Sequence, residues 1–259
     1  MEFEGLIIDR PLLAIFEDRE GNIIGTANDF SNFSINTSSE SKDKTDSVGS
    51  LIKRIYTSKS VEVSAESALF TPSIAGMQFG SGVEKATTSN KVVMPKILQY
   101  KKAETITLPN VPIEGSLMVY GCTASGIPDL TKKYVKDTAA DAGKYALSDK
   151  TLTLPTDATD VIQVKYDYEA ESGFKIVNNA DKFPRSCKAT FQMLVYEKCN
   201  DTLRLAYVVF PNYQMSPDFD WTLDTESTHP FSGMGQIDAC SIDKQLVYIS
   251  LSEDDTREE

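Results

Sequence analysis

Four acidic residues surround the only tryptophan of the chain, and they form the densest group of side chains that could do chemistry. They are Asp218, Asp220, Asp224 and Glu226, and the tryptophan is Trp221. Clustered carboxylates can bind calcium or share the acid and base roles of glycoside hydrolysis. A single strand supplies too few ligands for calcium, and no Asp-x-Asp-x-Asp-Gly loop accompanies the cluster. A solvated acidic strand face is the preferred interpretation.

Other catalytic motifs are missing from the sequence. The single histidine, His229, precedes a proline and has no partner residue in view, which is typical of a structural side chain. Neither a Gly-x-Ser-x-Gly elbow nor a P-loop occurs, and the glycines of residues 76–82 lack the strand-loop-helix order of a dinucleotide site. We therefore expect no enzyme and no cofactor.

The cysteines are scattered without any Cys-x-x-Cys pair, at Cys122, Cys187, Cys199 and Cys240. Cys187 and Cys240 lie beside apparent strands, where a free cysteine behaves as a small core residue. Buried thiols are therefore expected, with a disulfide or a zinc site as the alternative. We expect no bound metal.

The chain is strongly acidic, with 38 acidic against 26 basic residues and a formal net charge of −12 over 259 residues. Tight binding of nucleic acid is disfavoured, because no basic patch is available to release counterions from phosphates. The sequence shows neither the pattern of a secretory signal nor an apolar run long enough to span a membrane. We expect assembly in a reducing cytoplasm, without a membrane partner.

Short alternating runs of apolar and polar residues recur along the chain, and each has the length of a strand. Residues 12–16 and 23–27 flank a turn whose Gly21 can take a positive φ. Residues 189–196 and 203–210 flank another polar turn. One short helix is expected at residues 71–80, with threonine as N-cap, proline next and glycine at the end. This density of strands predicts an all-β sandwich or barrel.

A polar segment at residues 34–60 differs from the rest, because residues 36–47 carry charges of alternating sign and no large apolar side chain. A solvated loop is one interpretation, and a long arm that orders against a neighbouring subunit is the other. Apolar residues return at Leu51, with a spacing that fits a helical turn or an amphipathic strand. The residues expected to contact other subunits are Asn36, Thr37, Glu40, Lys42, Asp43, Lys44, Asp46, Lys53, Arg54 and Tyr56.

Residues 101–171 contain five or six strand-like runs of their own. We interpret them as a small β-sandwich inserted into a host β-sandwich that is formed by residues 1–100 and 172–259. One continuous large sheet is the alternative. The acidic C-terminal residues 252–259 are expected to be frayed.

The order of these elements resembles the major tail tube proteins of long-tailed, double-stranded DNA bacteriophages. In that family the long loop reaches adjacent subunits and rings. The resemblance implies a tail-tube-type antiparallel β-sandwich or barrel with one short helix and an inserted Ig-like β-sandwich. The segments that carry it are residues 12–28 (opening hairpin), 34–60 (long loop), 61–65 and 72–79 (strand and helix), 188–210 (late hairpin), 219–223 (next strand) and 234–239 (closing strand).

If the resemblance holds, the chain is a non-enzymatic virion protein of the phage tail, assembled in the host bacterial cytoplasm. Copies join by heterologous contacts into hexameric rings, which stack into a tube that conducts DNA during ejection. Its partners are then copies of itself, other tail proteins at the tube ends and double-stranded DNA in transit past a negative wall. Residues 34–60 are expected to stay disordered in the free monomer.

Two alternatives from other classes remain open. One is a capsid decoration protein or another virion component. The other is a carbohydrate-binding β-sandwich module, which would use Trp221, Tyr213 and the aspartates near them.

Overall fold

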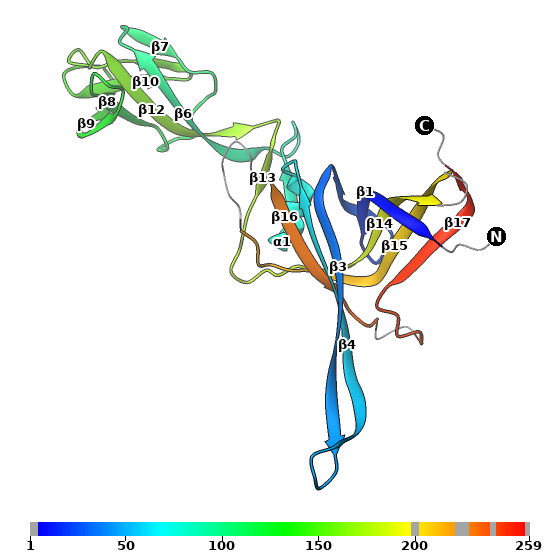
Figure 1. The fold of residues 1–259 in the computed structure, drawn as a ribbon. Coiled ribbons are helices and arrows are strands. Elements are labelled where there is room, and N and C mark those ends of the chain that lie inside the picture. Colours follow the sequence, from blue (N-terminus) through cyan, green and yellow to red (C-terminus); the bar gives the residue numbers. More distant parts are fainter. Residues whose placement is uncertain (1–4, 198–201, 221–227, 239–241, 257–259) are drawn as a thin grey trace. The chain divides into compact units, whose positions relative to one another are not determined.

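The structure is a computed structural model that describes residues 5–197, 202–220, 228–238 and 242–256. The described residues are almost entirely β, with one short helix, which confirms the expected fold class. The chain divides into two compact units, Met1–Val83 with Ile176–Glu259, and Glu84–Lys175 (Figure 1). We call them the first and the second unit.

The first unit is built on one large, mainly antiparallel sheet. Its strands run in the order β2-β1-β14-β15-β16-β4-β3, and β17 pairs with β15 beside this path. These elements are β1 (Leu6–Glu17), β2 (Ile23–Asn28), β3 (Phe30–Thr45), β4 (Leu51–Ser67), β14 (Ser186–Glu197), β15 (Thr202–Met215), β16 (His229–Gly235) and β17 (Tyr248–Thr256).

The sheet of the first unit curls around a single aromatic core. Every strand of the main path contributes a side chain to that core. Strand β1, next to one end of the path, also contacts β3, which forms the other end. Phe16, Phe191 and Tyr213 lie at its centre with ring centroids 5.8 to 6.3 Å apart. Tilted and edge-to-face pairs at this distance stabilise a core beyond their buried area. The result is a nearly closed, barrel-like sheet.

Helix α1 (Pro72–Gln78) closes one side of this core. Thr71 stands at the N-cap with Pro72 in the first turn, as expected, although the threonine side chain makes no capping hydrogen bond. The chain leaves the helix through Gly80, whose φ of 67° suits glycine. Ile74 is fully buried in the core and Met77 packs against it. The N-terminal proline and C-terminal glycine therefore mark the helix as the sequence predicts.

The second unit folds around a core of its own. Seven strands follow the path β6-β12-β8-β9-β10-β11-β7, in which only the β9–β10 pair is parallel. Side chains from both ends of this path share one cluster, for example Tyr100 of β6 and Ile106 of β7, so the path folds over itself. The strands are β6 (Val92–Lys101), β7 (Thr105–Thr107), β8 (Met118–Cys122), β9 (Pro128–Lys136), β10 (Lys144–Ser148), β11 (Thr151–Thr153) and β12 (Val161–Ala170).

The structure places the start of the second unit earlier than residue 101, where the insertion was expected to begin. Strand β6 pairs along its whole length with β12, so it belongs to the second unit. The remaining short strands, β5 (Val83–Lys85) and β13 (Phe174–Ile176), pair with each other.

Two expectations near the C-terminus are wrong. The strand expected at residues 234–239 begins at His229, because His229, Phe231 and Gly233 alternate as buried residues against β4, and the proline between them is tolerated near a strand start. The C-terminal segment does not fray at Ser252, since β17 continues to Thr256, which pairs with Arg204 of β15 after an irregularity in the register.

Candidate functional site

The acidic cluster does not lie on a strand. Asp218 and Asp220 are exposed in an irregular segment after Pro217, and no strand forms at Phe219 and Asp220 as had been expected. Trp221, Asp224 and Glu226 lie outside the described residues. Within the described residues, no group of three or more His, Cys, Asp or Glu side chains is placed to hold a metal ion.

Tyr213 is not available to stack on a sugar. Its side chain is 0% exposed and packs against Phe16 and Phe210 in the core of the first unit. The alternating pattern of β15 directs Tyr213 inward, so its expected part in carbohydrate binding is wrong.

The histidine has a structural role. His229 is 2% exposed and accepts a hydrogen bond at Nδ1 from the Thr71 backbone N–H at 3.3 Å. Its Nε2 therefore carries the proton and donates to Gln78 Oε1 at 2.9 Å. Burial lowers the pKa of His229 to about 4. The ring stays neutral at physiological pH and joins helix α1 to strand β16.

Both cysteines that the structure describes are buried free thiols, as expected for Cys122 and Cys187. Burial raises the pKa of Cys187 to about 12, so the thiolate needed for reactivity does not form at physiological pH. Cys199 and Cys240 lie outside the described residues.

The polar segment forms a long hairpin instead of a loop. Residues 34–60 were expected to be a loop that stays disordered in the monomer, but β3 and β4 pair from Phe30↔Ser67 to Thr45↔Leu51, with three shifts of register along the way. Only residues 61–67 of β4 also pair with β16, so residues 38–60 pair with each other alone. We call residues 38–60 the arm. Figure 1 shows it continuing past the rest of its sheet.

The turn at the tip of the arm explains why a hairpin forms. Asp46 Oδ1 accepts hydrogen bonds from the backbone N–H groups of Val48 and Ser50 at 3.0 and 2.7 Å. Gly49, with φ of 88°, takes the conformation that the turn requires. Ile52, Ile55 and Thr57, which follow the turn, suit a strand. The sequence did not reveal the strand at residues 51–60 because neither of its faces is buried in a core.

One ion pair of the arm forms within the arm itself. Arg54 donates two hydrogen bonds to the Asp43 carboxylate, at 2.7 and 2.9 Å, across the Asp43↔Arg54 strand pair. The hydrogen bond from Arg54 lowers the pKa of Asp43. This pair links the two strands of the hairpin, so Asp43 and Arg54 are already paired in the single chain.

The register divides the expected contact residues between the two faces of the hairpin. All of them are exposed. One face carries Asn36, Glu40, Lys42, Lys44 and Lys53. The other face carries Thr37, Asp43, Arg54 and Tyr56, and Asp46 belongs to the turn.

The end of the arm exposes five large apolar side chains, of which only Tyr56 was among the expected contact residues. Val48 is 86% exposed and Ile52 is 61% exposed, and Tyr56 is 67% exposed. Leu51 and Ile55 are exposed beside them. Their spacing was visible in the sequence, but only a hairpin brings them together at one end. We call these five residues the arm tip.

Comparison with known proteins gives a family for the chain. No helix within the described parts of the chain has the length and hydropathy needed to cross a membrane. No curated protein matches the sequence. The family model of the YomU/Tube protein family matches residues 6–244, a range that includes the arm and all of the second unit. The chain belongs to the YomU/Tube protein family, whose description indicates a phage tube-like structural protein.

Proposed function

We propose that the chain is a major tail tube subunit that polymerises into stacked hexameric rings around a channel for DNA ejection. The YomU/Tube family is a family of phage structural proteins and is not known to contain enzymes. Membership of this family implies that the chain is a component of the virion. In this proposal the partners are further copies of the chain, other tail proteins at the tube ends and double-stranded DNA in transit. Assembly takes place in the cytoplasm of the host bacterium.

The observation that carries the proposal is the arm with its apolar tip. Five large apolar side chains at the end of a two-stranded ribbon contact water in the single chain, and such groups mark a contact site for another protein. Each side chain of this kind contributes about 1.5–3 kcal/mol when it is fully buried. A pocket on a neighbouring copy would bury the arm tip and join successive rings.

Free strand edges in the first unit support association within a ring. Strand β2 pairs only with β1, and β17 pairs only with β15 among the described strands. Each edge therefore offers unpaired backbone groups that another chain can bind. Pairing such edges between neighbours would close the strands of a ring into one barrel and remove every edge at once.

The charge of the chain supports a channel that does not hold DNA. Residues 84–175 contain 12 basic and 12 acidic residues, whereas the rest of the chain contains 14 basic and 26 acidic residues. The net charge of −12 therefore belongs to the first unit alone. A tube wall built from that unit would repel phosphates and let DNA slide.

The proposal is tested by sedimentation of an arm-tip variant. Ile52→Ser with Tyr56→Ser removes apolar surface from the arm tip while leaving the turn and the Asp43–Arg54 pair in place. We expect the unmodified chain to pellet as polymer at high concentration and this variant to stay in the supernatant with an unchanged circular dichroism spectrum.

The matched control removes exposed apolar surface from the second unit. Leu130 is 81% exposed and Ile127 is 63% exposed, so Leu130→Ser with Ile127→Ser should pellet like the unmodified chain. If the arm-tip variant also pellets normally, the arm tip is not the contact that drives polymerisation.

A further inference from the structure

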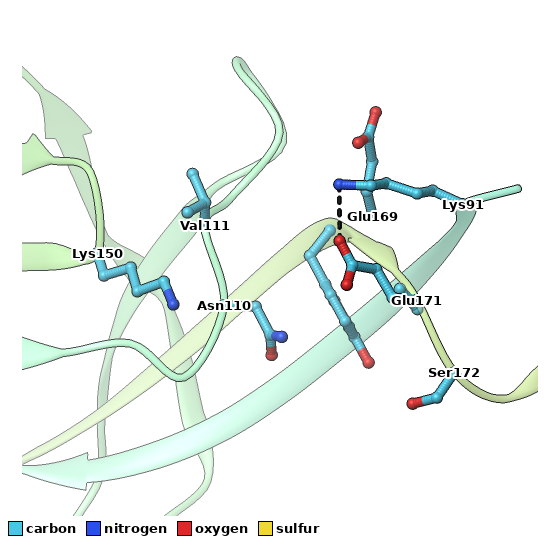
Figure 2. A pocket seen from close by; sticks show the side chains of 9 residues that line it. Lys91, Asn110, Val111, Lys150, Glu169, Glu171 and Ser172 are labelled. Atoms are coloured by element: carbon cyan, nitrogen blue, oxygen red, sulfur yellow. Dashed lines mark ion pairs between the residues drawn. The ribbon is translucent and has the colours of Figure 1, made fainter. Parts of the chain in front are cut away.

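The second unit contains a pocket of about 550 Å³ that polar side chains from separate segments line. Figure 2 shows Lys150 and Asn110 on one side and Lys91 with Glu171 on the other. Tyr168 and Ala170 of β12 also line the pocket, together with Val111. A ligand would therefore meet charged and amide groups on two sides, which is unusual for a pocket of this size.

Backbone hydrogen bonds hold the walls of the pocket in place. The Leu108 N–H donates to the carbonyl of Lys150 at 2.8 Å and ties the β10–β11 turn to the loop that follows β7. The Ile113 N–H donates to the carbonyl of Asp167 at 2.8 Å and ties the same loop to β12. A ligand would bind to a site that is already formed, which reduces the entropy lost on binding.

Asn110 is oriented as a hydrogen-bond donor. Lys96 Nζ donates to Asn110 Oδ1 at 2.8 Å and lies 5.3 Å from the centre of the Tyr168 ring. Because an ammonium group can only donate, the Asn110 oxygen must face Lys96. The amide N–H groups of Asn110 are thereby left to donate elsewhere, and Lys150 adds an ammonium on the same side of the pocket.

The opposite side of the pocket supplies acceptors. Lys91 Nζ lies 2.8 Å from Glu171 Oε1, and this hydrogen bond lowers the pKa of Glu171, so the carboxylate stays ionised. Its second oxygen can accept a hydrogen bond from a ligand. Glu169 adds another carboxylate, so two lysines and two glutamates balance the charge of the lining.

We propose that this pocket binds a neutral sugar unit of a glycan. Sugar hydroxyl groups both donate and accept, so they match an amide and an ammonium on one side and a carboxylate on the other. Tyr168 offers apolar ring surface for the C–H groups of the sugar. An apolar ligand would bury polar groups of the lining without offering them hydrogen bonds, and the two glutamates offset the attraction of the two lysines for an anion.

The test is saturation-transfer difference NMR on the full chain, which works for monomers and for polymers. The probes are oligosaccharides of glucose, galactose, mannose, N-acetylglucosamine and N-acetylgalactosamine, with glucuronate and inorganic phosphate as charged probes. We expect at least one neutral oligosaccharide to bind with Kd on the order of 1 mM. Asn110→Ala and Glu171→Gln should each weaken that binding about tenfold.

Matched controls are Asn178→Ala and Glu114→Gln, which change exposed residues outside the pocket lining. Both should leave Kd unchanged. The proposal is overturned if no neutral sugar shows saturation transfer, if only glucuronate or phosphate binds, or if the pocket variants bind like the controls. Because the readout does not depend on polymerisation, it is independent of the proposed tube function.

Discussion

His229 connects two elements through both of its ring nitrogens, and this makes its protonation state matter. The Thr71 N–H donates to Nδ1, and Nε2–H donates to Gln78, whose own Nε2 donates to the Pro230 carbonyl at 2.9 Å. A proton on Nδ1 would replace an accepted hydrogen bond by a repulsive contact with the N–H of Thr71. The buried ring is therefore built to remain neutral.

The first prediction follows from this network. Burial lowers the folded-state pKa of His229 to about 4, whereas an unfolded histidine titrates near its ordinary value of 6.5. Between these values the unfolded chain binds more protons, so the free energy of unfolding should fall as the pH drops from 6.5 towards 4. Urea unfolding across this range should show a steeper loss for the unmodified chain than for His229→Gln. Equal slopes would contradict the assignment.

The second prediction concerns a glycine that tight packing requires. A Cβ atom at Gly233 would lie 2.5 Å from the Tyr213 ring and from the Gln214 carbonyl oxygen. Gly233→Ala should destabilise the first unit by about 1–3 kcal/mol, since both neighbours are held in the core. Thermal unfolding measures the loss. Ser232→Ala, at the neighbouring position of β16, should cost much less, and similar losses for both variants would refute the packing argument.

At the scale of elements, one five-residue turn recurs in the fold. In residues 18–22 and 46–50 the aspartate carboxylate accepts two backbone N–H groups, and a glycine follows with φ of 85° and 88°. In residues 123–127 a threonine replaces the aspartate, and the Thr123 hydroxyl accepts a hydrogen bond from the Ile127 N–H at 3.3 Å. Hairpins of different lengths therefore share one way of reversing the chain.

The third prediction tests this turn in the arm. An isolated two-stranded ribbon is only marginally stable, so the turn should matter more in the arm than in a hairpin supported by a core. Asp46→Ala removes two hydrogen bonds and should destabilise the arm by about 1 kcal/mol. Hydrogen exchange should then quicken across residues 38–60 of the monomer while β14 and β15 stay protected.

The control for the third prediction is the equivalent change in the first hairpin. Asp18→Ala breaks the same hydrogen bonds, but β1 also pairs with β14, so exchange in β1 should change little. An arm that is as strongly protected as β14 in the monomer, with or without Asp46, would contradict the view that the arm is marginal.

The sequence predicts elements well where local chemistry decides them, and less well where distant contacts do. Thr71, Pro72 and Gly80 mark helix α1, and alternation marks the β14–β15 hairpin. The start of β16 could not be predicted from its sequence, because Pro230 is a residue that strands usually exclude. The strand forms there because it pairs with β4. Apart from Tyr56, the arm-tip residues were not predicted as contacts, because their exposure becomes clear only once the pairing of β3 with β4 is known.

At the scale of the whole molecule, charge separates the two units. The net charge of −12 lies in the first unit, and the second unit is neutral. The fourth prediction is that the full chain does not bind double-stranded DNA at physiological ionic strength, since too few basic groups are available to release counterions. Fluorescence anisotropy of labelled DNA measures this. Saturable binding with a steep salt dependence would contradict a channel that lets DNA slide.

Polymerisation into a tube is the central claim, and electron microscopy of the concentrated full chain tests it most directly. The account predicts hollow tubes of stacked sixfold rings, with the arm-tip variant Ile52→Ser with Tyr56→Ser forming none. Discrete trimers or monomers at every concentration, or filaments without a central channel, would contradict it.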